Sequence, residues 1–493
     1  MMKLNPQSIS VNLDDVVASL NIQEPATHLM VTGITHDNRE VEPGFVFAAL
    51  PGFNRHGAEF ASTAVEQGAV AILTDSHGAQ ALNNLDVPLI VSANPRIDMA
   101  HAAQMIYGDA QTRLLSVGVT GTNGKTTTAH MVEALFDAND LKPIMIGTVG
   151  VRFNNETFPS SRTTPEATDL HRMLFAVEQR GSRSLVMEVS SHALSLGRVD
   201  GIAFDVAVFT GLSQDHLDFH HSMDEYFLAK AELFTSTRAR HAVICVDDDW
   251  GKKLVSISQV PTLTYSVNGP ADWMATDIQV DEAGLTTFTA QGPVAKHHIK
   301  LGLPGSFNIA NALAAVAVSD ALNLVDSKIQ SALENVRVAG RLERVDCGQN
   351  FVCLVDYAHT PDAVERVVEV ARSHSRGRVI TVLGCGGDRD AAKRPLMGAA
   401  AAPSDLIIIT DDNPRSEDPI HIRAAIRSGI SENNEVVEIG DRREAIRYAV
   451  LHAQPGDWIL VLGKGHETGQ DLAGVVTPFD DRVVLAEILG ELK

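Results

Sequence analysis

Cysteine is scarce in this sequence, with only four among 493 residues. Cys245, Cys347, Cys353 and Cys385 form no CxxC pair, so neither a zinc site nor a disulfide framework is indicated. Thiols without such a framework fit a reducing compartment. Long apolar runs are also absent: no stretch could cross a membrane, and the start, MMKLNPQSISVNLDD, lacks the apolar core of a signal peptide. The sequence therefore predicts a cytoplasmic protein without membrane insertion.

Positive charge is the second shortage. The chain has 40 lysines and arginines against 62 aspartates and glutamates, which gives a formal net charge of -22. This surplus of negative charge argues against nonspecific binding to nucleic acid or to an anionic membrane surface. An anionic substrate would need local basic pockets within the overall negative field.

The length of the chain and its alternation of strand-like and helical segments predict three α/β domains. A chain of this length is too long for one hydrophobic core. Residues 1–110 hold short strand-like runs around a helical segment, which predicts a small N-terminal α/β domain. Strands and helices alternate over residues 111–340, as in a doubly wound parallel sheet with a phosphate loop. The alternation restarts after VAGRLERV and predicts a Rossmann-like α/β domain over residues 341–493.

The stretch SVGVTGTNGKTTT, residues 116–128, looks like a phosphate-binding loop but departs from the Walker pattern. That pattern has a glycine, four free residues and then Gly-Lys-Ser/Thr. Val119 stands at the first glycine position, and the glycines fall instead at Gly118 and Gly121. The stretch is therefore a damaged motif, a chance Gly-Lys-Thr, or a subclass with its own chemistry.

The groups that bind phosphate are nevertheless present in this stretch. Gly121 and Gly124 let backbone N–H groups converge, and a helix that begins near Lys125 adds its positive dipole end. Lys125 supplies a positive charge for the β- and γ-phosphates, and Thr126 offers a hydroxyl to Mg²⁺. A glycine-rich turn with an incidental lysine is the alternative, but strand, loop and helix in this order favour phosphate binding.

Two further segments that follow strands carry candidate metal ligands. Glu188 ends a strand in SLVMEVS, and His216 lies in GLSQDHLDFHHS, so both are expected at the carboxyl edge of the sheet. A carboxylate and a neutral imidazole suit a divalent cation beside phosphates. Taken singly, Glu188 has the alternative of a surface charge and His216 that of a helix cap or core residue.

Several motifs together resemble the Mur ligases, the ATP-dependent enzymes that form amide bonds in bacterial cell-wall precursor synthesis. They are VTGTNGKTTT, EVSSHALSLGR, LSQDHLDFH, YFLAKAELF, GSFNIANALAA, GRLE, VDYAHTPDA and LGCGGDRDAAKRPLMG. The matching blocks run in the family's order from about position 31 to 482, and they are most similar to the enzymes that add the third residue of the stem peptide. The family's phosphate loop has the GTNGKT form, so the resemblance explains Val119 as a family trait.

The resemblance implies a reaction and its partners. In the family, ATP phosphorylates the γ-carboxylate of D-Glu in UDP-MurNAc-L-Ala-D-Glu, and an incoming amine attacks the acyl phosphate. Such chemistry depends on positioning and on charge neutralisation, to which Mg²⁺ contributes. The three domains would bind the nucleotide sugar, ATP and the amino acid respectively. We expect the chain to be a monomer.

The resemblance also assigns residues. Lys230 in YFLAKAELF matches a lysine that the family carbamylates, and the two carbamate oxygens would hold a second Mg²⁺; without the motif it would be taken for a solvated helix lysine. The catalytic residues would be Lys125, Lys230 and His216. The metal ligands would be Thr126, Glu188, His216 and carbamylated Lys230. The ATP-binding residues would be Gly121, Thr122, Asn123, Gly124, Lys125, Thr126, Thr127, Asn308, Arg341 and Asp356, with His359 nearby. The residues that bind the acceptor nucleotide would be Asn38, Phe53, Asn54, Arg55, Thr163, Thr164, Ser190 and Arg198.

The segment TDDNPRSEDP, residues 410–419, indicates which amino acid is added. In this enzyme type Asp-Asn-Pro-Arg is typical of enzymes that add meso-diaminopimelate, which has a distal carboxylate that lysine lacks. Arg415 can fork that carboxylate with two hydrogen bonds, whereas lysine would face its positive charge. An exposed turn with a solvated arginine is the alternative. The residues expected to hold diaminopimelate are Arg389, Asp412, Asn413, Pro414, Arg415, Gly463 and Glu467, the last taking the distal ammonium.

Four positions depart from the family pattern, and other functions stay open. Asn38 replaces a usual Ser, Gly211 an Asn, His221 a Gly, and Leu196 a Gln found in some relatives. These changes affect substrate contacts and leave the phosphate loop and Lys230 intact. The alternatives are a lysine- or ornithine-adding enzyme, a folylpolyglutamate synthetase, and a nucleotide-binding scaffold without ligase activity.

Overall fold

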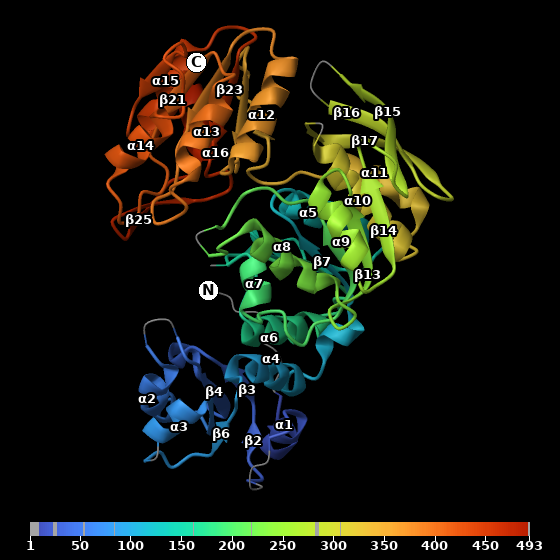
Figure 1. The fold of residues 1–493 in the computed structure, drawn as a ribbon, viewed down its shortest axis with the longest axis vertical. Coiled ribbons are helices and arrows are strands. Elements are labelled where there is room, and N and C mark those ends of the chain that lie inside the picture. Colours follow the sequence, from blue (N-terminus) through green and yellow to red (C-terminus); the bar gives the residue numbers. More distant parts are fainter. Residues whose placement is uncertain are drawn as a thin grey trace.

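The chain forms three α/β parts, each with its own sheet (Figure 1). The computed structural model describes residues 9–22, 27–52, 55–82, 84–160, 162–217, 219–281, 285–305 and 307–491. In Figure 1 the N-terminal part lies at the bottom and the C-terminal part at the top left, with the central part between them. This arrangement confirms the expected fold class. The expected boundaries at residues 110 and 340 stay predictions.

The N-terminal part is a four-stranded parallel sheet with helices on both faces. Its strands are, in order, β3 (Gly33–Thr35), β4 (Phe45–Ala49), β5 (Ala71–Thr74) and β6 (Leu89–Val91). Apolar residues alternate between two cores, so α1 (Leu13–Ser19) and α4 (Pro95–Ile106) cover one face while α2 (Ala61–Glu66) and α3 (Ser76–Ala81) lie at the other. A short pair, β1 (Val11–Asn12) and β2 (Met30–Val31), adjoins this sheet.

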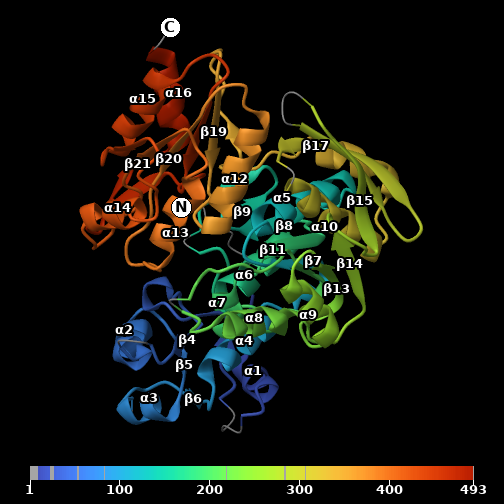
Figure 2. The same ribbon diagram turned by 45° about the horizontal axis from the view of Figure 1, so that its top comes forward.

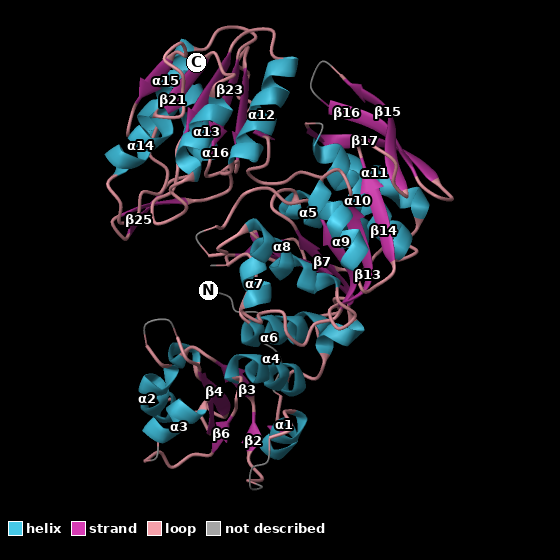
Figure 3. Cartoon of the chain, viewed as in Figure 1, coloured by secondary structure: helices cyan, strands magenta, loops and turns pink. Residues whose placement is uncertain are grey.

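The central part is built on an eleven-stranded sheet whose middle is parallel. In order across the sheet, the strands are β10 (Glu156–Phe158), β9 (Gly150–Phe153), β8 (Pro143–Gly147), β11 (Ser184–Glu188), β7 (Leu115–Thr120), β12 (Phe204–Phe209), β13 (Ala239–Cys245), β14 (Thr262–Ser266), β15 (Trp273–Val280), β16 (Leu285–Gln291) and β17 (Lys296–Pro304). The strands from β8 to β15 are parallel, as expected, whereas antiparallel strands extend both edges. Figure 3 shows β15 to β17 at the edge of the central part away from the N-terminal part.

Helices cover both faces of the central sheet, which makes it doubly wound (Figure 2). One face packs against α5 (Lys125–Ala138), α10 (Phe307–Ala321) and α11 (Ile329–Glu334). The other face packs against α6 (Ala167–Glu178), α7 (Ser191–Ser195), α8 (Met223–Ala231) and α9 (Asp249–Ile257). The alanine-rich α10 is apolar on nearly all sides and is buried accordingly.

The C-terminal part is a second doubly wound unit with a six-stranded sheet. Its strands are β18 (Glu343–Arg344), β19 (Val352–Asp356), β23 (Trp458–Leu462), β20 (Val379–Leu383), β21 (Leu406–Ile409) and β22 (Val436–Glu438), of which β18 is antiparallel. One face packs against α12 (Pro361–His374), α13 (Lys393–Ala401) and α14 (Pro419–Arg427), and the other against α15 (Arg442–His452) and α16 (Asp481–Glu491). The hairpin of β24 (Gly469–Leu472) and β25 (Val475–Pro478) completes this part. None of the described helices is long and apolar enough to span a membrane.

Candidate active site

A cavity of about 600 Å³ opens where β7, β11 and β12 end. These three strands are neighbours and run parallel, so the loops that follow them meet at one edge of the sheet. Side chains from α8 and α10, from the linker after α11, and from the loop after β19 complete the walls. The expected site residues that line the cavity are Thr122, Asn123, Gly124, Lys125, Thr126, Thr127, Thr163, Glu188, Ser190, His216, Lys230, Asn308, Arg341, Asp356 and His359.

The structure explains why Val119 can occupy the first Walker position. Val119 belongs to β7, pairs with Glu188 and Val208 on the neighbouring strands, and is fully buried. The loop turns only after the strand, at Gly121 and Gly124, whose φ angles are 146° and 87°. Both lie in the region that favours glycine, so these two residues rather than Val119 shape the phosphate loop.

Lys125 and Lys230 converge on one backbone carbonyl of this loop. The Lys125 Nζ donates hydrogen bonds to the carbonyls of Gly121 and Thr122, each at 2.9 Å. The Lys230 Nζ, on α8, donates to the same Gly121 carbonyl at 2.9 Å. Lys230 is only 1% exposed, so it is no solvated helix lysine. Burial and the neighbouring Lys125 charge hold the pKa of Lys230 well below its usual value, which favours the neutral amine.

Glu188 is fixed at the end of β11. Its side chain is fully buried and accepts hydrogen bonds from the Thr148 N–H at 2.8 Å and from the Thr148 hydroxyl at 3.0 Å. Gly147 precedes Thr148 and has no side chain, and a Cβ there would collide with the Glu188 carboxylate. The local sequence therefore holds the carboxylate in one position at the cavity wall.

His216 faces the same cavity from the loop after β12, with a left-handed φ of 55°. Desolvation holds the pKa of His216 well below its ordinary value, with the charges of Lys230 and Lys125 acting in the same direction and the Asp215 carboxylate acting against them. The imidazole is therefore neutral at physiological pH and can present a lone pair. A buried carboxylate, a neutral imidazole and the Thr126 hydroxyl are donors that suit a divalent cation.

The linker into the C-terminal part brings Arg341 to the phosphate loop. The Arg341 Nη2 donates to the Thr126 hydroxyl at 3.0 Å, and the guanidinium lies 4.6 Å from the centre of the Tyr357 ring. Asp356 accepts from the Leu342 N–H at 2.6 Å and the Ala358 N–H at 2.7 Å, so it also holds the linker. Burial raises the pKa of Asp356 above its ordinary value.

Two other expected residues of the ATP side are held by hydrogen bonds. Asn308 donates from Nδ2 to the Pro304 carbonyl at 2.6 Å and accepts from Asn311 at 2.9 Å. The His359 Nδ1 lies 2.8 Å from the Tyr357 carbonyl, and burial lowers the pKa of His359 to about 4. Cys245 also lines this wall of the cavity, where burial raises the pKa of its thiol to about 12.

The residues expected to bind diaminopimelate form a separate group in the C-terminal part. Asn413 donates from Nδ2 to the Glu467 carboxylate at 2.8 Å. Lys464, which is fully buried, donates to both Asn413 and Glu467 at 3.0 Å. Gly463 has a φ of 112°, and a Cβ there would collide with the Asp412 carboxylate. Sequence reasoning missed Lys464, because an isolated lysine in a loop is normally solvated.

Arg415 lies at the edge of this group with a left-handed φ of 52°. Its Nη1 donates to the Gly387 carbonyl at 2.6 Å, and its N–H donates to the Asp471 carbonyl at 3.1 Å. Arg415 and the exposed Arg389 approach each other over Gly386. Pro414 is buried beside them. None of the seven residues expected to bind diaminopimelate lines the cavity with the phosphate loop.

Besides Arg341, three polar contacts between described residues join the C-terminal part to the phosphate edge of the central part. Asn123 donates from Nδ2 to the Asp362 carboxylate at 2.8 Å. The Lys393 Nζ lies 3.6 Å from the Asp215 carboxylate. The third contact comes from His466, next to Glu467, whose Nε2 lies 3.0 Å from the Thr148 carbonyl. Thr148 also donates to Glu188, the candidate metal ligand. Thr148 therefore connects Glu188 with His466, the neighbour of Glu467 in the group expected to bind diaminopimelate.

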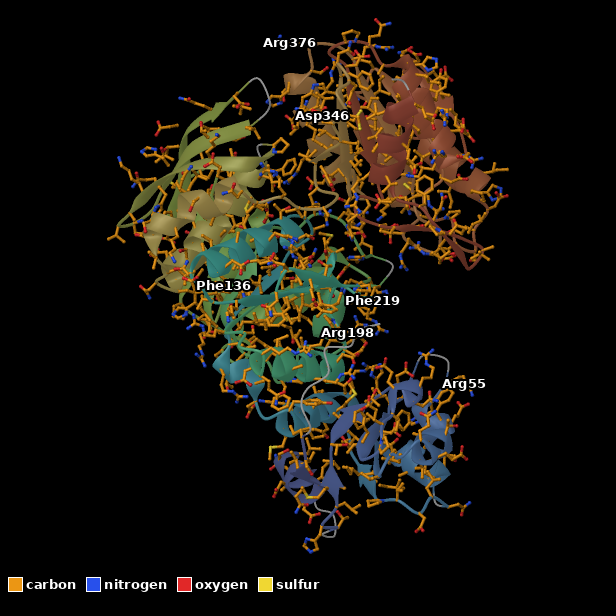
Figure 4. All side chains as sticks on the ribbon, turned by 180° about the vertical axis from the view of Figure 1, so that it is seen from behind. Arg55, Phe136, Arg198, Phe219, Asp346 and Arg376 are labelled. Atoms are coloured by element: carbon orange, nitrogen blue, oxygen red, sulfur yellow. The ribbon has the colours of Figure 1, made fainter. Side chains whose placement is uncertain are left out.

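The residues expected to bind the acceptor nucleotide are spread over two parts of the chain. Thr163 and Ser190 line the cavity, and Thr164 donates to the Glu188 carbonyl at 2.9 Å. Arg198 lies 2.9 Å from Glu166, on the side of the central part that faces the N-terminal part (Figure 4). Neither Arg198 nor Thr164 lines the cavity.

The N-terminal residues of this set lie farther from the cavity. Arg55 pairs with Glu59 at 2.7 Å, stands over the Phe60 ring, and is labelled on the N-terminal part in Figure 4. Asn38 begins a 3₁₀ turn over Asn38–Glu40. Neither residue lines the cavity, and Phe53 and Asn54 lie outside the described residues.

Comparison with known families accounts for all three parts. The Mur ligase middle domain matches residues 119–319, the Mur ligase glutamate ligase domain matches 340–465, and the Mur ligase family catalytic domain matches 30–115. The chain is 48% identical to a UDP-N-acetylmuramoyl-L-alanyl-D-glutamate--2,6-diaminopimelate ligase of Streptomyces coelicolor, over 97% of this chain and 96% of that one. This chain belongs to the Mur ligase family. It is an ATP-dependent ligase that forms amide bonds.

Further relatives place this Mur ligase within the family. It is 46% identical to the enzyme of the same name from Corynebacterium glutamicum, over 90% of this chain and 89% of the relative. A solved structure of a 2,6-diaminopimelate ligase with the same name is 31% identical, with a TM-score of 0.69 over 98% of this chain and 99% of the other. The MurF ligase of Thermotoga maritima in complex with ADP shares the fold at 19% identity, with a TM-score of 0.65 over 93% of this chain and 96% of the other.

Proposed function

We propose that this Mur ligase joins meso-diaminopimelate to the γ-carboxylate of D-Glu in UDP-MurNAc-L-Ala-D-Glu, in peptidoglycan precursor synthesis. ATP is converted to ADP and phosphate through an acyl-phosphate intermediate. The observation that carries the choice of amino acid is the buried Lys464, which holds Glu467 and also Asn413 of the motif that contains Arg415. We also propose that the enzyme works as a monomer in the cytoplasm.

The phosphate loop would hold the ATP phosphates during the first step. The Lys125 ammonium now donates to two loop carbonyls and would turn to the β- and γ-phosphates when ATP binds. Arg341, already on the Thr126 hydroxyl, would add a second cation near the transferred phosphoryl group. Glu188, His216, Thr126 and a carbamate on Lys230 would hold Mg²⁺. The metal would supply neutralisation of the charge that develops on the phosphoryl oxygens.

The state of Lys230 supports carbamylation. Only a neutral amine can attack CO₂, and burial beside Lys125 favours that form of Lys230. The product carries negative charge, which Lys125 would then stabilise instead of repelling.

We expect Lys230→Ala to lower kcat by at least about a hundredfold, because the phosphoryl group would lose an electrostatic partner. The exposed Lys252→Ala is the matched control and should keep full activity.

The second step needs an amine held against the acyl phosphate. Glu467 would take the distal ammonium of diaminopimelate and Arg415 its distal carboxylate, which leaves the other amino group free to attack. Lys464 donates to both Glu467 and Asn413 and would thereby fix the position of the Glu467 carboxylate. Lysine would leave Arg415 without a carboxylate partner and would be rejected on that ground.

An amino-acid panel tests the proposal. Purified enzyme, ATP and UDP-MurNAc-L-Ala-D-Glu are incubated with meso-diaminopimelate, L-lysine or L-ornithine, and phosphate release is followed together with the ligated product. We expect efficient turnover only with meso-diaminopimelate. Equal turnover with lysine would contradict the role of Arg415. A parallel incubation with ATP, glutamate and a folate that gave product would favour the folylpolyglutamate synthetase alternative. ATP binding without any amide product would favour a scaffold.

A further inference from the structure

A second large cavity lies behind the linker that leads into the C-terminal part. It measures about 1010 Å³ and is walled by β17, the linker residues 337–344, β19 and the start of β23. Arg341 and Leu342 line both this cavity and the cavity with the phosphate loop. The two cavities therefore lie on opposite sides of one short segment. We call the second one the hinge cavity.

The hinge cavity is strongly basic in a chain whose net charge is -22. Five arginines line it and only one carboxylate, Glu343, does so. The arginines are Arg152, Arg337, Arg341, Arg344 and Arg376. Such a local reversal of sign attracts anions against the overall field of the protein.

Part of this positive charge is not neutralised. Arg152 pairs with Glu133 at 3.3 Å and Arg344 with Asp346 at 3.2 Å. In the described part of the chain, however, Arg337 and Arg341 form no ion pair with a carboxylate. The buried Nε of Arg341 also has no hydrogen-bond partner there. A buried donor without a partner is costly, so the Arg341 guanidinium is prepared for an anion, while the exposed Arg337 adds a charge that no described carboxylate neutralises.

Arg337 is held in place over a glycine of the wall. Its Nη1 donates to the Val336 carbonyl at 2.7 Å and to the Glu334 carbonyl at 3.3 Å. A Cβ on Gly302 would collide with that nitrogen, so the lack of a side chain at Gly302 makes room for the guanidinium. The two carbonyls and the glycine orient Arg337 without cancelling its charge.

The remaining walls are aromatic or amide. Trp458 and Phe351 line the hinge cavity, and His374 stacks on Trp458 with ring centres 6.1 Å apart. Gln349 and Asn350 add hydrogen-bonding groups. Figure 4 shows Arg376 and Asp346 on the side of the C-terminal part that faces the strands of the central part. The cavity combines charge for an anion with flat surfaces for an attached ring or chain.

We propose that the hinge cavity binds a small phosphorylated metabolite at a site separate from the ATP site. Several guanidinium groups around one cavity match the multiple charges and acceptor oxygens of a phosphate group. Bound there, the ligand draws the Arg341 guanidinium away from Thr126 and so weakens ATP binding. The linker is thereby a regulatory element as well as a connection between domains.

Inorganic pyrophosphate is the first probe, because it carries the charge without a nucleotide. Isothermal titration in magnesium-free buffer compares the wild type with Arg337→Ala, Arg337→Gln and Lys125→Ala. The matched control is Arg443→Ala on α15, a half-buried arginine that pairs with Glu487 and lines neither cavity. We expect both Arg337 variants to weaken pyrophosphate binding at least tenfold, and Lys125→Ala and the control to keep the hinge site.

Three outcomes of this titration would overturn the proposal. They are a lack of binding to the wild type, loss of all binding in Lys125→Ala, and unchanged binding in both Arg337 variants. Citrate serves as a carboxylate probe of comparable charge. If citrate binds as tightly as pyrophosphate and with the same dependence on Arg337, the assignment to phosphate is wrong.

Ligation kinetics test the coupling to ATP. Pyrophosphate should raise the KM for ATP in the wild type to a plateau of about fivefold or more, because two linked sites change each other's affinity by a finite factor. The plateau should disappear in Arg337→Ala. Inhibition of equal size in both enzymes, or inhibition that rises without limit, would place the effect at the phosphate loop and contradict the hinge site.

Discussion

Arg415 is oriented by its backbone before any ligand binds. The left-handed φ, the hydrogen bond to Gly387 and the backbone contact to Asp471 all constrain where its guanidinium points. Orientation of this kind lowers the conformational cost of gripping a carboxylate. The sequence motif names Arg415 as the candidate for the distal carboxylate, and this role stays a prediction; the left-handed backbone could not be predicted from the motif.

Replacing Arg415 should therefore separate diaminopimelate from lysine. We expect Arg415→Ala to raise the KM for meso-diaminopimelate on the order of a hundredfold, since two charge-assisted hydrogen bonds are lost. Turnover with lysine should stay the same or improve. Steady-state kinetics with both amino acids measure the ratio of kcat/KM for meso-diaminopimelate to that for lysine. The variant Arg415→Lys tests whether a positive charge suffices without the two hydrogen bonds of a guanidinium. An unchanged preference in Arg415→Ala would contradict the assignment.

Glu133 makes stability depend on pH. Burial raises the pKa of Glu133 to about 7, with Arg152 acting in the opposite direction. The folded state therefore binds a proton that the unfolded chain releases near pH 4.5, so this residue's contribution to stability falls as the pH rises from about 4.5 to about 7.

The variant Glu133→Gln tests that sign. We expect it to be more stable than the wild type at pH 8, by at most about 3 kcal/mol, and nearly equal at pH 4.5. Urea denaturation at the two pH values gives the difference. If Glu133→Gln is less stable at pH 8, the ion pair with Arg152 outweighs the burial of the carboxylate.

At the scale of elements, periodicity predicted the parallel strands and the helices between them. The strand β7, the phosphate loop and α5 follow each other as expected, because each has a clear apolar pattern. The antiparallel extensions were not predicted. Much of β15 is exposed and polar, and its pairing with β16 depends on contacts outside its own sequence.

The phosphate loop gives a prediction about two neighbouring glycines. Gly121→Ala should abolish ATP binding, because a Cβ would collide with Thr210 at a φ of 146°. Gly118→Ala should be milder, since Gly118 lies in β7 and its added Cβ would stand 3.0 Å from the Phe204 ring. Nucleotide titration and thermal unfolding of both variants measure the contrast. Equal losses of ATP binding in the two variants would mean that the end of β7, and not the turn at Gly121, determines the conformation of the phosphate loop.

At the scale of the whole molecule, the sequence could not predict which distant groups meet. Asn123 and Asp362 are 239 positions apart, and Thr148 and His466 are 318 apart, yet each pair forms a hydrogen bond. A single sequence motif does not show which distant segment of the chain will pack against it. The burial of Lys464 has the same origin, because the surrounding fold creates its environment.

The separation of the two substrate groups predicts domain closure. Arg415 and Glu467, the proposed ligands of the amino acid, do not line the cavity with the phosphate loop, so our proposal requires the amine to move toward the proposed acyl phosphate. Small-angle scattering should show a smaller radius of gyration with an ATP analogue, UDP-MurNAc-L-Ala-D-Glu and meso-diaminopimelate together than with UDP alone. An unchanged radius would mean that the substrates meet without closure.

The shielded thiols make this protein suited to direct observation of that movement. Cys245, Cys353 and Cys385 are buried, and burial raises the pKa of each thiol to about 12. A maleimide dye reacts with thiolates, so these three positions should stay unlabelled in the folded enzyme. Only the half-buried Cys347 would need replacement. Two cysteines introduced on exposed helices of different domains could then carry a donor and an acceptor fluorophore for single-molecule measurements during turnover.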